Sequence, residues 1–214
     1  MERPVKIRID RVTLDGELGM PEQAKGVVIF AHGSGSSRLS PRNTFVSRIL
    51  QQAGIGTLLF DLLTLEEDHV SERRFDIDLL ARRLVGATRW LMARPEMKGV
   101  SYAYFGASTG AAAALQAAAL EGAAIKAVVS RGGRPDLAMR YLELVRAPTL
   151  LIVGERDRQV LHLNRLALIR LAGEKELSVI PGATHLFEEP GTLEEAALRA
   201  REWFVHHLEP NGRL

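Results

Sequence analysis

The sequence predicts an α/β fold, in which a doubly wound, mostly parallel sheet of about seven or eight strands carries helices on both faces. Short runs with β-strand character alternate with longer helical segments along most of the chain. Most of these short runs are apolar throughout, which is typical of parallel strands buried on both sides. The order of the segments shows no internal repeat and no linker, so we expect residues 1–214 to form a single domain.

The predicted strands fall into two groups. The first two runs alternate polar and apolar residues, as expected of edge strands with one face in water. They cover residues 5–9 and 12–14. The later runs are apolar and should form the centre of the sheet, except for the last, which we place at its end. These runs cover residues 27–31, 57–60, 102–105, 127–129, 149–153 and 177–180.

Four helices are predicted in the gaps between the strands. The first has apolar residues close to a 3.6-residue period, and the second is mostly alanine, so its neighbours can pack closely against it. Thr192 and Glu195 have the spacing of a capping box at the start of the last helix. The predicted helices cover residues 75–92, 109–120, 161–171 and 193–208.

Composition excludes several kinds of chemistry. The chain of 214 residues has no cysteine, which rules out a disulfide, a thiolate metal site and a cysteine nucleophile. Its formal net charge is +2, and its basic residues occur in scattered pairs. We therefore expect no nucleic-acid partner. No apolar run reaches the roughly 18 residues of a membrane span, and the N-terminus lacks the apolar core of a signal peptide, so we expect no membrane partner and a cytoplasmic location. The sequence leaves the oligomeric state open.

A G-x-S-x-G motif follows the predicted strand 102–105 and opens the alanine-rich helix. Its residues are Gly106, Ala107, Ser108, Thr109 and Gly110. In a strand–turn–helix setting, this pattern lifts a serine hydroxyl out of the sheet on a sharp turn. Ser108 is therefore the candidate nucleophile.

A serine nucleophile needs a base, and the base needs an acid that orients it. Asp157 follows the strand 149–153, and His185 follows the strand 177–180, so both should lie at the carboxyl edge of the sheet. We assign Asp157 as the acid and His185 as the base. Glu155 is the alternative acid, although it lies closer to the end of its strand.

The oxyanion of such a reaction requires hydrogen-bond donors. A His-Gly turn follows the strand 27–31, and we place one backbone N–H donor at Ser34, with Gly35 as the alternative. The second donor is the backbone N–H of Thr109, directly after the nucleophile. We expect His32 to brace this loop.

Together, the segments HGSGSSR, FGASTG, GERD and GATHLFEEPG resemble those of a small α/β-hydrolase of the dienelactone-hydrolase-like group. The resemblance extends over nearly the whole chain and implies a two-step acyl transfer with no metal and no organic cofactor. Dienelactone hydrolase uses a cysteine nucleophile, whereas this chain has Ser108, which favours ordinary ester chemistry. We therefore expect a serine hydrolase acting on small-molecule esters. The alternatives are a thioesterase or peptidase with the same triad, or a catalytically silent binding module.

The segment after the strand 127–129 leaves no room for a cap domain, which favours an open site for small or short-chain esters. Arg131 and Arg134 lie at this strand end and are candidates for binding an acidic group of the substrate, as are Arg38 and Arg42 beyond the His-Gly turn. The interpretation that we favour is that these arginines brace loops by pairing with Asp136, Asp61 or Glu188.

Overall fold

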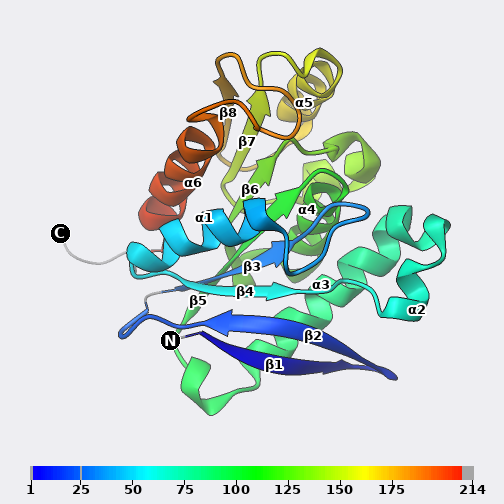
Figure 1. The fold of residues 1–214 in the computed structure, drawn as a ribbon, viewed down its shortest axis with the longest axis vertical. Coiled ribbons are helices and arrows are strands. Elements are labelled where there is room, and N and C mark those ends of the chain that lie inside the picture. The colour runs from blue at the N-terminus through cyan, green and yellow to red at the C-terminus, as the bar shows by residue number, and fades with distance from the viewer. Residues whose placement is uncertain (1, 25, 209–214) are drawn as a thin grey trace.

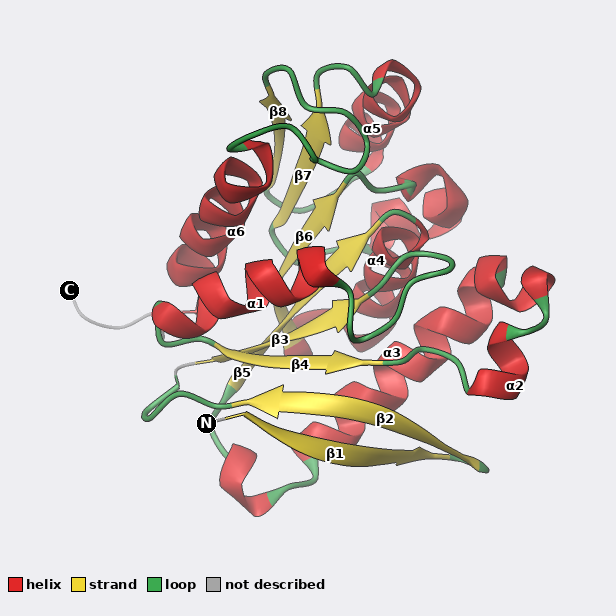
Figure 2. Cartoon of the chain, viewed as in Figure 1, coloured by secondary structure: helices red, strands yellow, loops and turns green. Residues whose placement is uncertain are grey.

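The computed structural model describes residues 2–24 and 26–208, in which an eight-stranded sheet carries helices on both faces (Figures 1 and 2). The order across the sheet is β1-β2-β4-β3-β5-β6-β7-β8. The strands are β1 (Glu2–Ile9), β2 (Val12–Gly19), β3 (Gly26–Ala31), β4 (Gly56–Phe60), β5 (Ser101–Ala107), β6 (Ile125–Arg131), β7 (Thr149–Gly154) and β8 (Lys175–Ile180). The predicted fold class is confirmed.

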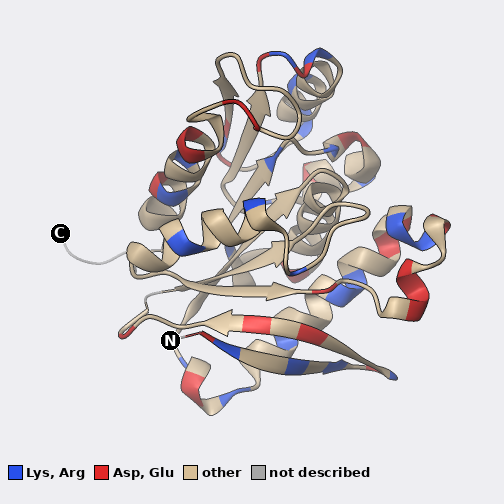
Figure 3. Cartoon of the chain, in the orientation of Figure 1, with Lys and Arg blue, Asp and Glu red and all other residues tan. Residues whose placement is uncertain are grey.

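Strand direction divides the sheet into two parts. β2 pairs antiparallel with β1 on one side and with β4 on the other. All other pairs are parallel, so six strands bring their carboxyl ends to one edge. Lys and Arg lie along β1 and Asp and Glu along β2, with Lys6 directly opposite Asp15 (Figure 3).

The helices form two layers, each with its own buried cluster. On one face, α3 (Ile77–Met92), α4 (Thr109–Glu121) and the last part of α5 (Arg158–Arg170) pack against the apolar side chains of the sheet. On the other face lie α1 (Pro41–Gln52) and α6 (Thr192–Leu208). The remaining elements are the short helix α2 (Leu65–Asp68) and four 3₁₀ segments at 71–75, 95–97, 122–124 and 135–144. Every helix in the described part of the chain is too short or too polar to span a lipid bilayer.

Several predicted boundaries differ from those in the structure. β2 continues to Gly19, well past the predicted 12–14, because its second half pairs with β4. The helix α1 was not predicted, although Pro41 at its first turn and the N-cap Ser40, which accepts from the N–H of Asn43, are signals of a helix start. α3 starts later than predicted because Asp76 caps it.

The predicted capping box of the last helix is wrong. Thr192 is already the first residue of α6, and its hydroxyl donates to the carbonyl of Glu189 at 2.8 Å. The N–H of Glu195 instead donates to the carbonyl of Gly191 at 2.9 Å. Gly191 has a φ of 80°, so a tight glycine turn provides the entry into the helix that a side-chain cap was expected to provide.

His32 joins the ends of β3 and β4. Its Nε2 accepts from the backbone N–H of Leu62 at 3.0 Å, which requires that this nitrogen carries no proton. Its Nδ1 therefore carries the proton and donates to the carbonyl of Gly33 at 3.0 Å. Burial lowers the pKa of His32 and outweighs the opposing effects of the Gly33 carbonyl, Asp61 and Asp68. These contacts agree with the expected bracing role.

We predict that His32 makes the stability of the fold depend on pH. The unfolded state takes up the proton near pH 6.5, whereas the folded state does so only at a lower pH, so the free energy of unfolding should fall as the pH drops below about 6.5. Urea unfolding between about pH 5 and pH 7.5 measures this slope. His32→Asn should reduce it, and the exposed His69→Asn should not. An unchanged slope in His32→Asn would contradict the prediction.

Candidate active site

Ser108 occupies a sharp turn between β5 and α4. Its φ of 51° and ψ of −121° lie in a region that non-glycine residues rarely adopt. Neighbouring backbone groups hold this conformation: the Ser108 N–H donates to the carbonyl of Arg131 at 3.3 Å, and its own carbonyl accepts from the N–H groups of Ala111 and Arg134 at 3.1 Å. The turn is thereby fixed at the carboxyl ends of β5 and β6.

The turn requires both glycines of the motif, because neither position has room for a side chain. A Cβ atom at Gly106 would lie 2.4 Å from the Cα of Ala111. A Cβ atom at Gly110 would lie 2.1 Å from the carbonyl oxygen of Ala31, at the end of β3. The first turn of α4 therefore lies directly against the strands, and the G-x-S-x-G spacing follows from steric exclusion on both sides of Ser108.

His185 and Asp157 are in direct contact at the ends of the last two strands. The Nδ1 of His185 lies 2.6 Å from the Oδ2 of Asp157. The Asp157 side chain is 13% exposed, and that of His185 is 39% exposed. The carboxylate is thus largely shielded from water, and the imidazole is partly open to solvent.

Glu155, the alternative acid, has a different partner. Its Oε2 accepts from the N–H of Gly182 at 2.8 Å. Two backbone bonds join the same loops: the Glu155 N–H donates to the carbonyl of Ile180 at 3.0 Å, and the Arg156 N–H donates to that of Ala183 at 2.9 Å. Glu155 therefore helps to tie the loop after β7 to the loop after β8, which fixes the backbone on either side of the His185–Asp157 contact.

Two further glycines bring the serine and the histidine to one place. A Cβ atom at Gly132, just beyond β6, would lie 3.6 Å from both Cε1 and Nδ1 of the His185 ring. A Cβ atom at Gly33 would lie 3.1 Å from the Cβ of Ser108. The His185 ring thus packs against the end of β6, and the loop after β3 packs against Ser108. Within residues 2–24 and 26–208, no hydrogen bond joins the Ser108 hydroxyl to His185.

The backbone N–H groups of Ser34 and Thr109 were predicted to be the two oxyanion donors, but in the structure the first of them already has a hydrogen-bond acceptor. The N–H of Thr109 lies at the start of α4, where it has no intrahelical acceptor. The N–H of Ser34, however, donates to the side-chain hydroxyl of Thr109 at 2.8 Å. The sequence analysis considered only the backbone of Thr109, although a hydroxyl residue directly after the nucleophile was visible in the motif. Gly35 lies beyond this contact, is exposed and has a φ of 68°.

Three of the four arginines near the site pair with the acidic residues that the sequence analysis named. These pairs are Arg38 with Asp61, Arg42 with Glu188 at 3.8 Å, and Arg134 with Asp136 at 2.8–2.9 Å. This pairing agrees with the bracing interpretation for each of them.

Arg131 differs from these three because it is only 7% exposed and has no carboxylate partner in the described part of the chain. Its Nη2 lies 3.5 Å from the Oδ1 of Asn43, and the guanidinium lies 5.7 Å from the ring centre of Phe187. Burial, with a smaller contribution from the charge of Arg42, lowers the pKa of Arg131 to about 10. The guanidinium therefore remains charged at neutral pH, enclosed between α1 and the loop that carries His185.

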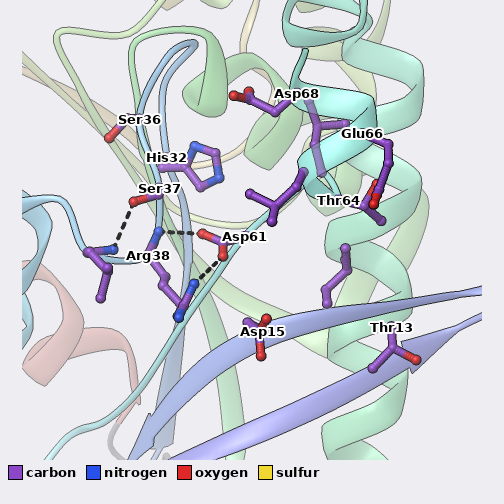
Figure 4. A pocket seen from close by; sticks show the side chains of 14 residues that line it. Thr13, Asp15, His32, Ser36, Ser37, Arg38, Asp61, Thr64, Glu66 and Asp68 are labelled. Atoms are coloured by element: carbon purple, nitrogen blue, oxygen red, sulfur yellow. Dashed lines mark hydrogen bonds and ion pairs between the residues drawn. The ribbon is translucent and has the colours of Figure 1, made fainter. Parts of the chain in front are cut away.

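A cavity of about 570 Å³ lies between the start of β2, the loop after β3 and the segment after β4 (Figure 4). Its wall includes His32, Arg38, Asp61 and Glu66, and the dashed lines that end at Asp61 in Figure 4 mark its contacts with Arg38. Neither Ser108 nor His185 lines this cavity. The residues described in the structure contain no cluster of three or more histidine and carboxylate groups suited to a metal ion.

Comparison with known proteins gives the family. A family model described as an alpha/beta hydrolase domain matches residues 24–201. Two proteins from different strains of Mycobacterium tuberculosis, each named "Putative phosphoribosyl transferase", are 54% identical over 207 residues, which is 97% of this chain and 47% of theirs. The chain therefore spans about half the length of these curated relatives.

Solved structures resemble the chain over its full length. A crystal structure named dienelactone hydrolase, from Anabaena variabilis, is 54% identical with a TM-score of 0.95, covering 98% of this chain and 99% of that chain. The esterase domain of a Rhodothermus marinus protein is 19% identical with a TM-score of 0.79, covering 97% and 99%, and shows a shared fold. The sheet order, the strained serine after β5 and the family match lead to one conclusion: the chain belongs to the alpha/beta hydrolase family and has the fold of a hydrolase.

Proposed function

We propose that this protein is a serine hydrolase that cleaves small or short-chain carboxylic esters. The observation that carries the proposal is the strained Ser108 after β5, at the same edge of the sheet as the His185–Asp157 contact of 2.6 Å. Nucleophile, base and acid lie in the chain order Ser108, Asp157, His185, which is the order of α/β-hydrolases. The chemistry needs neither a metal nor an organic cofactor.

The proposed reaction has two halves. In the first, the Ser108 Oγ attacks the ester carbonyl carbon, its proton passes to Nε2 of His185, and the carbonyl electron pair moves to the oxygen. Collapse of this intermediate breaks the bond to the alcohol, which leaves with the proton from His185. In the second half, a water molecule gives its proton to His185 and attacks the acyl group, which releases the acid and restores Ser108.

Asp157 acts through the histidine in this scheme. Its carboxylate accepts a hydrogen bond from the Nδ1–H of His185, which leaves Nε2 free to take the proton of Ser108. The same contact stabilises the charge that the imidazole gains in each half of the reaction. Glu155 has a loop-bracing contact and no role in proton transfer.

An open site supports the choice of short esters. The link between β6 and β7 contains only the 3₁₀ segment 135–144, and no cap domain occurs within residues 2–24 and 26–208. The His185 side chain is 39% exposed, so a small ester can approach it from solvent. The same triad could act on thioesters or peptides, and the assay below distinguishes these substrates. We further infer that the transferase name of the M. tuberculosis relatives refers to the part of those proteins that this chain does not match.

We predict that a fluorophosphonate probe labels the protein at Ser108, because this probe reacts with activated serine hydroxyls. Ser108→Ala should abolish the labelling, and Ser71→Ala, at an exposed serine in the segment 71–75, should leave it unchanged. Gel fluorescence and peptide mass spectrometry give the readout. Absence of labelling in the wild-type protein would refute the mechanism and favour the silent binding module, whereas labelling that survives Ser108→Ala would show that another residue is the nucleophile.

Asp157→Asn should lower kcat by about 10³-fold or more, because an amide cannot stabilise the charged imidazole and favours the wrong tautomer. Glu155→Gln is the matched control, since its amide oxygen can still accept from the N–H of Gly182. Steady-state hydrolysis of p-nitrophenyl acetate measures both variants, and the control should stay within about threefold of wild type. A larger loss in Glu155→Gln would assign the acid to Glu155.

We expect kcat/KM to be highest for p-nitrophenyl acetate and butyrate and to fall for longer acyl chains, since no cap encloses an apolar acyl group. A series of p-nitrophenyl esters measures this trend, with the corresponding thioesters and a peptide nitroanilide as comparison substrates. Preference for long-chain triglycerides at an oil interface would contradict an open short-chain site, and faster cleavage of the thioesters would reassign the substrate class.

A further inference from the structure

The side chain of Thr109 lies at the contact between the start of α4 and the loop after β3. Thr109 is only 3% exposed, and its hydroxyl oxygen accepts from the N–H of Ser34 at 2.8 Å. A hydroxyl group has one proton to donate as well as lone pairs that accept. Across residues 2–24 and 26–208, no acceptor receives this proton. The structure therefore holds a buried, oriented hydroxyl with an unused donor beside the candidate nucleophile.

The surrounding backbone limits where this donor can point. Thr109 directly follows Ser108, and its own N–H is the first of α4, without an intrahelical acceptor. Gly33 packs against the Ser108 side chain, since a Cβ atom at Gly33 would lie 3.1 Å from the Cβ of Ser108. The N–H of Ser34 and the hydroxyl of Thr109 thus lie next to Ser108, the residue that would attack a substrate carbonyl.

We propose that the Thr109 hydroxyl is a side-chain donor of the oxyanion hole and that the N–H of Ser34 holds this hydroxyl in place by donating to its oxygen. The inference rests on the proposed serine hydrolase function. In the tetrahedral intermediate, the negative oxygen accepts from both the N–H and the O–H of Thr109. The bond from Ser34 orients the hydroxyl and polarises it, because a hydroxyl that accepts a hydrogen bond donates a stronger one. The donor is thereby in position before charge develops.

The same geometry permits an opposite role, which can be tested. If Thr109 merely occupies the N–H of Ser34, its hydroxyl has to move away before a substrate oxygen can bind there. Removing the hydroxyl would then free a donor and leave activity unchanged or higher. In the arrangement that we propose, removing it takes away a donor and its support, so activity falls. The two roles predict changes of opposite sign for one substitution.

Thr109→Val and Thr109→Ser form the matched pair for this test. Valine keeps the branched shape and loses the hydroxyl, whereas serine keeps the hydroxyl and loses the methyl group. For p-nitrophenyl acetate, we expect Thr109→Val to lower kcat by about 10- to 100-fold with KM changed by less than about threefold. Thr109→Ser should stay within about threefold of wild type. A trifluoromethyl ketone, which forms a tetrahedral adduct with the serine, should bind Thr109→Val more weakly by a similar factor.

Two results would overturn the proposal. Unchanged or increased kcat in Thr109→Val would show that the hydroxyl only blocks the N–H of Ser34. An equal loss in Thr109→Ser would show that the methyl group, and not the hydroxyl, is required. Urea unfolding of both variants identifies a loss of activity that comes from misfolding. If Thr109→Val is partly unfolded, the affinity of its folded fraction for the trifluoromethyl ketone shows whether binding of the tetrahedral adduct has become weaker or stronger. Failure of the wild-type protein to react with the fluorophosphonate probe would instead refute the serine mechanism itself, and this inference with it.

Discussion

The left-handed backbone of Ser108 is the constraint on which the arrangement of the site depends. Such a conformation costs on the order of 1–3 kcal/mol in a non-glycine residue and persists only when the surroundings enforce it. Here the enforcement comes from the close approach of α4 to β3 and β5, which leaves no room for a side chain at Gly106 or Gly110. The alanine-rich helix, with ten buried residues, makes that approach possible and anchors the turn in the core.

Charge is arranged unevenly around this turn. The arginines at the rim pair with carboxylates, which neutralises them and ties loops together. Arg131 is enclosed without such a partner, and it immediately precedes Gly132, which packs against the His185 ring. Because a buried cation without a carboxylate partner is costly, Arg131 sets the end of β6 apart from the other strand ends. Its field favours negative charge at this edge.

Local sequence patterns identified the fold and the candidate residues, and they failed where distant residues decide. The strands were recognisable because parallel strands are apolar on both faces, and Ser108, Asp157 and His185 because each follows such a strand. The extension of β2 to Gly19 depends on its pairing with β4, which is distant in the sequence. The start of α6 is a local exception, because the turn at Gly191 directly precedes the helix. The bond from Ser34 to the Thr109 hydroxyl joins residues 75 positions apart, so no local pattern contains it.

The ties between the loops after β7 and β8 have a mechanical consequence. Two backbone bonds and the Glu155 carboxylate fasten these loops to each other, and the contact of His185 with Asp157 lies between them. Ser108, in contrast, is fastened to the end of β6 and to α4. His185 and Asp157 are therefore held to each other by these loops, whereas different elements set the position of Ser108. A displacement of the two loops relative to the end of β5 would change the distance from His185 to Ser108 and leave the His185–Asp157 contact unchanged.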